Sequence, residues 1–363
     1  MNGLNMWNRP AKAVIRVKDR IDRSESKLSP SDDGFHVTTR EIGDFEWWYF
    51  DVYDQDTDCS LKIVAHLGTD PLRRRFYPQL AVSVSSPSVK RTLIRTYALE
   101  DFTGSTDFCD VRLKTEFRAY GGSPNEANVY HISVNADKFR ANLNFDRQIE
   151  GCKPLGAEVE AEKGSKKGVF FWAIPLPKAK VVGEFSLSGK KYTIKEGLGY
   201  HDHNYWKVDR ECKLFMDDII SKWYWGRSYA EGYTVIFMDV YFRQNQIKSL
   251  VIADETNIIH CSLNTTDVVP QDFRLDADLK SQYPTRITVK SLDHNNLFQM
   301  TLKAKEIVDK RDLLEGVNPV VKWLIKLLVS RPAYFGILAE SVVELDNDEI
   351  KGTALYEIMS FRG

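Results

Sequence analysis

Apolar and polar side chains alternate with a period of two along most of the chain after Asp44. The clearest case is the segment 139–145, Phe-Arg-Ala-Asn-Leu-Asn-Phe, in which every second side chain is apolar. Successive side chains of a strand point to opposite faces, so this pattern predicts an antiparallel strand with one face in a core and the other in water. Similar short runs recur at 61–67, 80–84, 129–134, 185–194, 233–242, 250–253, 286–289 and 297–302.

Turn-forming residues separate these runs, as in Gly-Gly-Ser-Pro at 121–124 and Ser-Gly-Lys at 188–190. Many short strands with frequent turns are typical of β-sandwiches and barrels. The chain has 363 residues, which is more than one ordinary core serves. We therefore predict an all-β protein with a polar lead-in over 1–38, an N-terminal β domain over 39–215 and a C-terminal β domain over 216–363. The lead-in has the polar composition of a disordered segment.

One apolar run near the C-terminus has the pattern of a short amphipathic helix. The pair Asn318-Pro319 fits a helix start and Ser-Arg-Pro at 330–332 fits its end, which predicts a helix over 320–329. We favour a helix that covers the end of a barrel. The alternative is a lid or a shallow membrane contact, because Lys322 and Lys326 form a cationic stripe. A helix of about ten residues is too short to span a bilayer.

Composition and charge narrow the function classes. The 50 basic and 51 acidic side chains are mixed along the sequence, and a net charge of -1 argues against a nucleic-acid partner. The five cysteines are widely spaced and lack a CxxC pair, which predicts reduced thiols. The first 33 residues lack a continuous apolar run, so we expect no secretory signal and a cytoplasmic location. We also expect no cofactor, because the sequence has no nucleotide fingerprint, P-loop or nucleophile elbow.

The segment 46–51, Glu-Trp-Trp-Tyr-Phe-Asp, is the first of three candidate sites. In a strand, its odd-numbered and even-numbered positions face opposite sides, and both faces carry aromatic rings. The plainer interpretation is a strand buried on two sides, and for most of these rings we favour it. The functional interpretation is that rings such as Trp47 and Trp48 line a cavity for a flat apolar ligand, with Glu46 at its rim.

The second candidate is the segment 197–206, Gly-Leu-Gly-Tyr-His-Asp-His-Asn-Tyr-Trp. Strand geometry would put His201 and His203 on one face, and Asp202 with Asn204 on the other. Two imidazoles supply two metal ligands, but no third His, Cys or Glu follows at a typical spacing, so we expect no metal. Two interpretations remain: satisfied hydrogen bonds that join the two domains, or catalysis, because histidine exchanges protons near neutrality and a buried carboxylate can hold its ring.

The third candidate combines Lys-Trp-Tyr-Trp-Gly-Arg at 222–227 with the apolar strand 233–242. Asp239 of that strand shares its face with Phe237 and Tyr241 and has almost no polar neighbours along the strand. A carboxylate among apolar groups either pairs with a cation, for which Arg227 is the candidate, or has a raised pKa and stays protonated. The first outcome is structural and the second is functional.

Four ordered motifs resemble the carotenoid 1,2-hydratase (hydroxyneurosporene synthase) family. They are Asp-Asp-Gly-Phe-His at 32–36, the segment 46–51, Gly-Tyr-His-Asp-His-Asn at 199–204 and Trp-x-Trp-Gly-Arg at 223–227. The ending at 352–357, Gly-Thr-Ala-Leu-Tyr-Glu, is also similar. That superfamily has a two-domain, calycin- or lipocalin-like all-β fold, and the fungal decalin-forming Diels-Alderases look like distant relatives. The resemblance implies an apolar isoprenoid or polyene ligand at the place where the two domains meet.

The resemblance also implies acid-assisted hydration of a carbon–carbon double bond. Protonation of such a bond creates a tertiary carbocation, so the reaction requires a strong acid and a shielded cation. Asp239 or Asp202 would deliver the proton, and aromatic faces would stabilise the cation. His203 or His201 would orient or deprotonate the water. Glu46, Asn204 and Arg227 are expected as structural or charge partners, and the expected ligand contacts are Trp47, Trp48, Trp206, Trp225, Phe237 and Tyr241.

One position departs from the family pattern, because Phe237 stands where a tyrosine is expected two residues before the acid. Two alternatives to hydration are therefore kept. The first is a Diels-Alderase-like cyclase that acts on a polyene by shape and by hydrogen bonds to a polarised carbonyl. The second is a lipocalin-like carrier that binds an apolar molecule without changing it.

Overall fold

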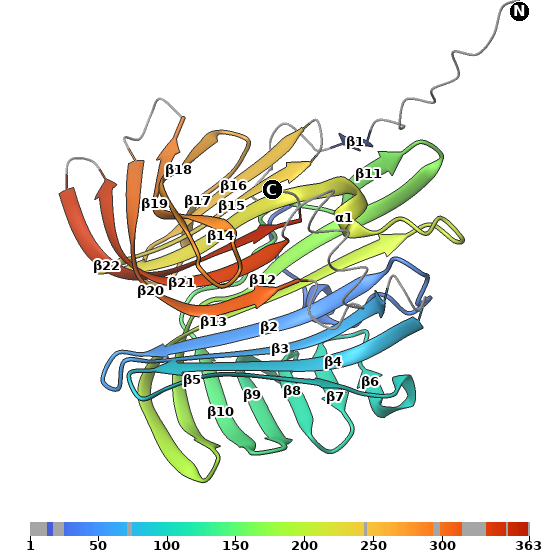
Figure 1. The fold of residues 1–363 in the computed structure, drawn as a ribbon, viewed down its shortest axis with the longest axis horizontal. Coiled ribbons are helices and arrows are strands. Elements are labelled where there is room, and N and C mark those ends of the chain that lie inside the picture. Colours follow the sequence, from blue (N-terminus) through green and yellow to red (C-terminus); the bar gives the residue numbers. More distant parts are fainter. Residues whose placement is uncertain are drawn as a thin grey trace, which may run out of the picture.

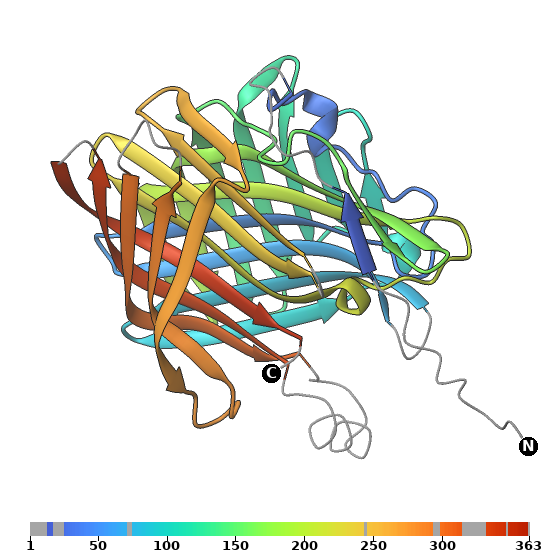
Figure 2. The same cartoon turned by 90° about the horizontal axis from the view of Figure 1, so that it is seen from above.

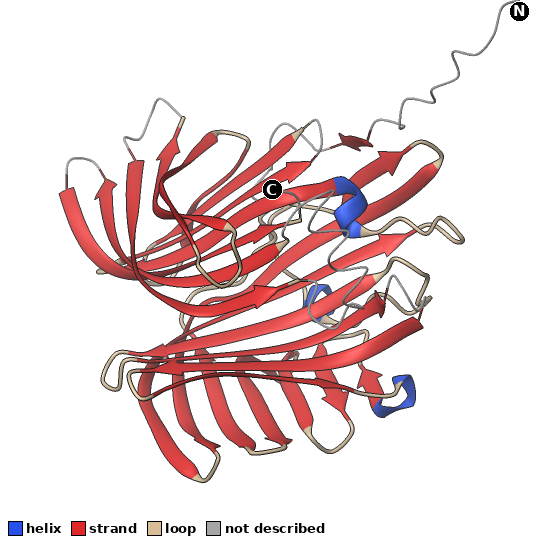
Figure 3. Cartoon of the chain, viewed as in Figure 1, coloured by secondary structure: helices blue, strands red, loops and turns tan. Residues whose placement is uncertain are grey.

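The computed structural model describes residues 13–16, 25–70, 75–242, 245–292, 298–313, 332–345 and 348–361. Within this part of the chain the structure is almost entirely β (Figure 3), and every strand pairing is antiparallel, as in the pairing of β2 (Phe45–Asp54) with β3 (Cys59–Asp70). The predicted all-β class is confirmed. The helix predicted over 320–329 lies outside the described residues.

Two curled sheets form the fold (Figure 1). The first is built around the path β5-β4-β3-β2-β13-β12-β10-β9-β8-β7-β6, and β11 joins β1 to β12. Besides β2 and β3, its strands are β1 (Ala13–Arg16), β4 (Arg75–Ser86), β5 (Val89–Thr96), β6 (Phe102–Gly104), β7 (Cys109–Leu113), β8 (Phe117–Ser123), β9 (Glu126–Ala136), β10 (Phe139–Arg147), β11 (Val159–Lys163), β12 (Lys166–Leu187) and β13 (Lys190–Val208).

The second sheet has the order β17-β16-β15-β14-β22-β21-β20-β19-β18 and curls beside the first (Figure 2). Its strands are β14 (Ile220–Ala230), β15 (Tyr233–Phe242), β16 (Gln246–Ala253), β17 (Ile258–Leu263), β18 (Thr266–Leu275), β19 (Gln282–Ser291), β20 (Phe298–Asp312), β21 (Ala333–Leu345) and β22 (Asp348–Ser360). The short helices are η1 (Pro30–Asp33), η2 (Leu99–Asp101) and α1 (Met216–Ile219).

The alternating pattern of the sequence reappears as alternating burial. Strand β10 contains the segment 139–145, and its apolar side chains are buried while the intervening polar ones are exposed. The first sheet ends at Val208 and the second begins at Ile220, on either side of the division predicted at residue 215. That the two halves are separate domains stays a prediction.

Three apolar cores result from the packing of the two sheets. The first-sheet core is enclosed by the first sheet and contains Trp48 and Phe50. The second-sheet core is enclosed by the second sheet and contains Phe237. The inter-sheet layer combines residues of both sheets, including Tyr200 and Trp225. Because side chains of a strand alternate, β2, β13, β14 and β15 each contribute to two of these cores.

Helices contribute little to this architecture. In the described part of the chain, none of them has the length and apolar character that a membrane crossing requires. The cytoplasmic location and the peripheral membrane contact through residues 320–329 stay predictions.

Candidate functional site

The His-Asp-His segment lies in the part of β13 that pairs with β2. His201 is opposite Phe50, and His203 is opposite Trp48. Each imidazole stacks on its partner, with ring centroids 4.0 Å apart for His201 and Phe50 and 4.7 Å apart for His203 and Trp48. Both histidines therefore face the first-sheet core. Asp202 points the opposite way, into the inter-sheet layer, as alternation along a strand requires.

His201 is held by a hydrogen-bond network that reaches η1. Its Nδ1 lies 2.9 Å from the carbonyl oxygen of Tyr49, and its Nε2 lies 3.1 Å from Oδ2 of Asp33. The hydroxyl of Tyr130 donates to the same carboxyl group over 2.9 Å. A carbonyl oxygen only accepts, so Nδ1 donates to Tyr49, and Nε2 faces the carboxyl group of Asp33. This pair is closed to solvent.

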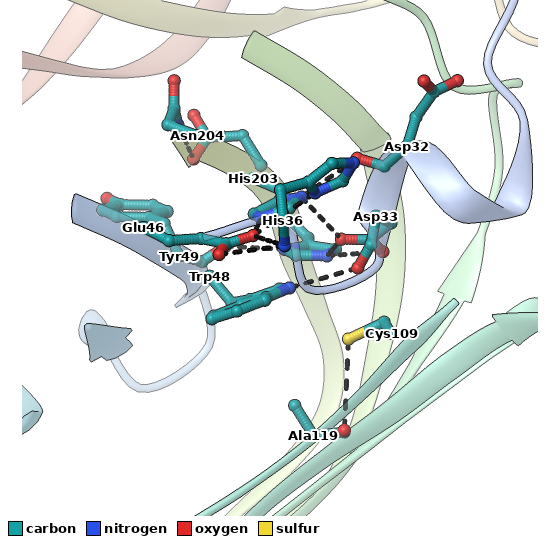
Figure 4. A network of polar contacts seen from close by, with 12 residues as sticks. Asp32, Asp33, His36, Glu46, Trp48, Tyr49, Cys109, Ala119, His203 and Asn204 are labelled. Carbon is teal, nitrogen blue, oxygen red and sulfur yellow. Dashed lines mark hydrogen bonds and ion pairs between the residues drawn. The ribbon is translucent and has the colours of Figure 1, made fainter. Parts of the chain in front are cut away.

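His203 is bound to Glu46 in the same core (Figure 4). Its Nε2 lies 2.8 Å from Oε1 of Glu46, and its Nδ1 lies 3.0 Å from the carbonyl oxygen of Asp32. The Nδ1 atom of His36 lies 3.3 Å from the same Oε1. Burial opposes ionisation of Glu46, but the hydrogen bonds from His203 and His36 hold its pKa below the usual value. The motif at 32–36 is thereby fastened to β2 and β13.

A buried ion pair joins the two sheets. Arg227 of β14 donates to the carboxylate of Asp51 of β2, and its guanidinium lies 4.7 Å from the centroid of the Tyr229 ring. The hydroxyl of Tyr229 donates to the carbonyl oxygen of Gly199 over 2.7 Å. Burial opposes the charge of Arg227, but Asp51 raises its pKa above the usual value. The predicted pairing of Asp239 with Arg227 is therefore wrong, because Arg227 pairs with the other sheet.

Asp202 is the first of two buried carboxyl groups that face the inter-sheet layer. It accepts hydrogen bonds from Nε1 of Trp172 over 3.2 Å and from the hydroxyl of Tyr200 over 2.9 Å. The amide of Asn204 donates to it over 3.0 Å. Burial nevertheless raises the pKa of Asp202 well above its usual value, because the ionised form loses its hydration.

Glu357 of β22 is the second carboxyl group in this layer. Its Oε1 accepts hydrogen bonds from the hydroxyl of Tyr49, over 3.0 Å, and from the hydroxyl of Tyr334. The Nζ of Lys62 lies 3.8 Å from the same oxygen. Burial raises the pKa of Glu357 above its usual value, and Lys62 and the two tyrosines offset only part of that effect.

A small cavity between the sheets adjoins Glu357. Its volume is about 10 Å³, close to the space that one water molecule requires. Asp309 of β20 and Lys62 of β3 also line it, with Nζ of Lys62 2.5 Å from Oδ2 of Asp309. Burial opposes ionisation of Asp309, but Lys62 and Arg311 lower its pKa to about 2. One cavity is therefore lined by a carboxyl group with a raised pKa and a carboxylate with a lowered pKa.

Aromatic rings cover the inter-sheet layer beside these carboxyl groups. The ring of Trp225 lies 5.1 Å from that of Tyr200 and 5.8 Å from that of Tyr49, measured between centroids. Among the described residues, the Nε1–H group of Trp225 has no hydrogen-bond acceptor. Buried N–H groups normally have a partner, so this donor is available to a polar group of a bound molecule.

Comparison with known proteins gives one relative by sequence. A hydroxyneurosporene dehydrogenase of Chlorobaculum tepidum is 27% identical over 232 residues, which are 55% of this chain and 58% of that protein. The resemblance to the carotenoid hydratase-like family is confirmed. The match leaves about two fifths of the relative's length unmatched, and no family model matches the chain.

Solved structures share the lipocalin-like fold of this chain. An AttH-like protein of Nitrosomonas europaea aligns with a TM-score of 0.61 at 12% identity, over 94% of this chain and 99% of its own. CghA in complex with Sch210972 aligns with a TM-score of 0.60 at 10% identity, over 96% and 99%. Kievitone hydratase of Nectria haematococca aligns with a TM-score of 0.55 at 13% identity, over 93% and 97%.

The ligand contacts predicted from the sequence do not meet in one place. Trp48 belongs to the first-sheet core, and Phe237 and Tyr241 line the second-sheet core. The remaining three pack in the inter-sheet layer, which makes them the better candidates: Trp47, Trp206 and Trp225. That any of the six contacts a ligand stays a prediction.

Asp239 also lies apart from the histidines. It is paired across the strands with Tyr224, and both face the second-sheet core. The amide of Gln246 donates to its Oδ1 over 2.6 Å. The neighbouring strand β16 therefore supplies a polar partner that the pattern along β15 does not contain. Burial raises the pKa of Asp239 to about 6, against the opposing hydrogen bond from Gln246 and the charge of Lys248.

We expect Asp239→Asn to remove a pH dependence of stability. The folded protein binds this proton more tightly than the unfolded chain, whose pKa is near 3.8, so wild-type stability falls as pH rises from 3.8 through about 6. The loss amounts to about 2–3 kcal/mol, at about 1.4 kcal/mol per pKa unit. Urea unfolding at pH 4 and pH 8 measures it. The half-exposed Asp267, replaced by asparagine, is the control, and an equal pH response in both variants would contradict the assignment.

Sequence reasoning assigned no role to several residues of the site. Asp33 belongs to a motif that was recognised, and Glu357 ends another. Lys62 and Asp309 lie outside every recognised motif, and each is a charged residue within a strand-forming segment. The signal that could have identified such residues is a charged side chain at a strand position that is expected to be buried. For Lys62, which lies between the buried Leu61 and Ile63, that expectation arises only once both faces of β3 are known to be covered.

Proposed function

We propose that the protein binds an apolar isoprenoid- or polyene-type molecule between its two sheets and hydrates one of its carbon–carbon double bonds by acid catalysis. The observation that carries this proposal is the water-sized cavity lined by both Glu357 and Asp309. Carboxyl groups whose environments push their pKa values apart are the usual arrangement for an acid and a base in one site. Here burial raises the pKa of Glu357, which favours its protonated form, whereas Lys62 and Arg311 lower the pKa of Asp309 to about 2 and favour its carboxylate.

Glu357 is the proposed proton donor. Tyr49 and Tyr334 both donate to its Oε1, which favours the acidic proton on Oε2. This proton adds to one alkene carbon, and the positive charge develops on the other. The faces of Trp225 and Tyr49 lie in the same layer and would stabilise that charge. Asp202, which faces the same layer, is the second candidate for the acid.

Water in the small cavity is the proposed nucleophile. Its oxygen bonds to the cationic carbon, and one of its protons passes to the carboxylate of Asp309. The proton that Glu357 lost is regained from Asp309 through water, so the enzyme returns to its initial state and the product gains one water. Lys62, 2.5 Å from Asp309 and 3.8 Å from Glu357, holds the two groups at the cavity. In this scheme His201 and His203 lie on the other face of β13 and position the strand.

The relatives support this proposal through their names alone. The sequence relative is named for hydroxyneurosporene and a structural neighbour for the hydration of kievitone. A second neighbour, CghA, was crystallised with Sch210972, which supports binding of a small molecule by this fold. Cyclisation of a polyene and simple carriage are therefore the alternatives that the test must separate.

The test is mass spectrometry of the organic extract of purified protein after incubation with host lipid extract. We expect wild-type protein to convert a bound polyene to a product heavier by one water, and Glu357→Gln to retain the polyene unchanged. Glu340→Gln, an exposed glutamate of β21, is the matched control and should behave as wild type.

Each other outcome selects an alternative. An isomer of unchanged mass indicates cyclisation, and one unmodified lipid held by wild type and variant alike indicates a carrier. If no lipid is bound in any sample, the proposal of an apolar ligand between the sheets is wrong.

A further inference from the structure

We propose that His36, Glu46 and His203 form a binding site for a divalent transition-metal ion inside the first sheet. The three residues come from separate segments: His36 follows η1, Glu46 lies in β2 and His203 lies in β13 (Figure 4). One nitrogen of each histidine and one carboxylate oxygen lie within 4.8 Å of one another. This site faces the first-sheet core, so it is distinct from the inter-sheet layer in which hydration is proposed.

The distances suit a single ion. The Nε2 of His203 lies 2.8 Å from Oε1 of Glu46, and the Nδ1 of His36 lies 3.3 Å from it. Metal–nitrogen and metal–oxygen bonds of about 2.0–2.2 Å place neighbouring ligand atoms roughly 3 Å apart. Both histidine–carboxylate distances are close to that value, so an ion requires only small shifts of these side chains.

The hydrogen bonds around the cluster favour a cation at its centre. The carbonyl oxygen of Asp32 accepts from Nδ1 of His203, which leaves the lone pair of Nε2 directed at Glu46 in the neutral ring. In that tautomer, two lone pairs 2.8 Å apart repel unless a proton or a metal ion lies between them. A metal ion would replace the protons through which the two histidines bind Oε1, and it would contact His36, His203 and the carboxylate together. A carbonyl bound to the distal nitrogen is also the usual support of a metal-binding histidine.

The carboxylate is held in place independently of the ion. The backbone N–H groups of His36 and Val37 donate to Glu46 over 2.9 and 3.0 Å. The side chains of Glu46 and His203 have no exposed surface, and that of His36 is 23% exposed. An ion would therefore enter past His36. Two histidines and one carboxylate are ligands typical of zinc and of non-haem iron, and they leave coordination positions open.

A neighbouring group of similar composition serves as a comparison. Asp33, Cys109 and His201 also place their ligand atoms within 4.8 Å of one another. Burial raises the pKa of the Cys109 thiol well above its usual value, which disfavours the thiolate that a metal requires. The proposal therefore covers the cluster of His36, Glu46 and His203 and excludes this second group.

The experiment uses full-length, tag-free protein that has been stripped with a chelator and dialysed. Zn²⁺ and Co²⁺ are titrated in, with bound metal measured by mass spectrometry and the Co²⁺ site by its visible absorption. We expect one equivalent of bound metal, a higher thermal midpoint with metal, and binding at least about tenfold weaker in His36→Ala. His36 is the ligand of choice because it is partly exposed and its replacement leaves the buried pair intact.

The chain offers a matched control. His131 also forms an exposed pair with a glutamate, Nε2 to Oε1 of Glu126 at 3.0 Å, but it belongs to neither group of three ligands. Binding that is unchanged in His131→Ala and in Cys109→Ser, and weakened in His36→Ala and His36→Gln, supports the proposal. Binding below one equivalent in wild type, or equal binding in the His36 and His131 variants, overturns it. Neither result bears on the proposed hydration.

Discussion

Glu357→Gln is expected to lower kcat for hydration by about 10²–10⁴-fold, the range for loss of a general acid. Glutamine keeps the shape of the side chain and can accept from Tyr49 and Tyr334 as Oε1 does. It cannot release a proton, so the alkene is bound and not protonated. The amount of lipid retained by the purified variant should therefore match that of the wild type, which separates loss of chemistry from loss of binding.

The pH dependence of the hydration rate provides a second test of Glu357. Glu357 must be protonated to act, and burial raises its pKa above the usual value. The rate should be constant at low pH and fall as pH rises through that raised pKa. The pKa of Asp309 is lowered to about 2, so this group stays ionised over the pH range of the assay and does not cause a second change in the rate. The residual rate of Glu357→Gln should lack the fall at high pH.

Two results would count against Glu357 as the acid. The first is a Glu357→Gln protein with wild-type kcat, which would move the role to Asp202 or Asp239. The second is an equal loss in Glu340→Gln, which would indicate a general effect on the second sheet. Asp202→Asn and Asp239→Asn are therefore measured beside it. Tyr334→Phe, which removes one donor to Oε1, should lower kcat less than Glu357→Gln does.

The sequence was sufficient for the class of fold because each strand carries its own signal. The alternation at 139–145 predicts β10. The alternation of side chains along a strand likewise predicts that His201 and His203 face away from Asp202. The sequence does not indicate how each sheet curls, and the curl decides which side chains pack against each face of a strand. The sequence pattern does not distinguish Trp48 from Trp225, yet Trp48 belongs to the first-sheet core and Trp225 to the inter-sheet layer.

The error on Arg227 has a specific cause. Strands β14 and β15 form a hairpin in which Tyr224 is opposite Asp239 and Arg227 is opposite Ile236. Side chains of directly opposed residues share a face, so Arg227 lies on the face away from Asp239. The short turn between Ala230 and Tyr233 fixes this register. Counting outward from that turn would have excluded the pair from the sequence, but nothing local identifies Asp51 of β2 as the partner.

The buried pair of Arg227 and Asp51 gives the second large expected effect. Arg227→Met should lower the free energy of unfolding by about 3–5 kcal/mol, because it leaves the carboxylate of Asp51 buried without its partner. Both side chains are almost completely buried, so water cannot replace the lost guanidinium. Urea unfolding followed by intrinsic tryptophan fluorescence measures the change. The exposed pair of Arg286 and Asp272 provides the control, and Arg286→Met should cost about 0–1 kcal/mol.

A double replacement distinguishes the cost of an unpaired charge from the loss of packing. In Asp51→Leu/Arg227→Met neither charge remains, so most of the stability lost in Arg227→Met should return, since apolar replacement of a whole buried pair is often neutral or stabilising. Similar losses in Arg227→Met and Arg286→Met would mean that the pair adds nothing beyond a surface contact. Failure of the double variant to recover would instead assign the effect to the packing of Arg227 on Tyr229, 4.7 Å from its ring centroid. Recovery would assign the loss in Arg227→Met to the unpaired buried charge of Asp51, whose side chain is almost completely buried.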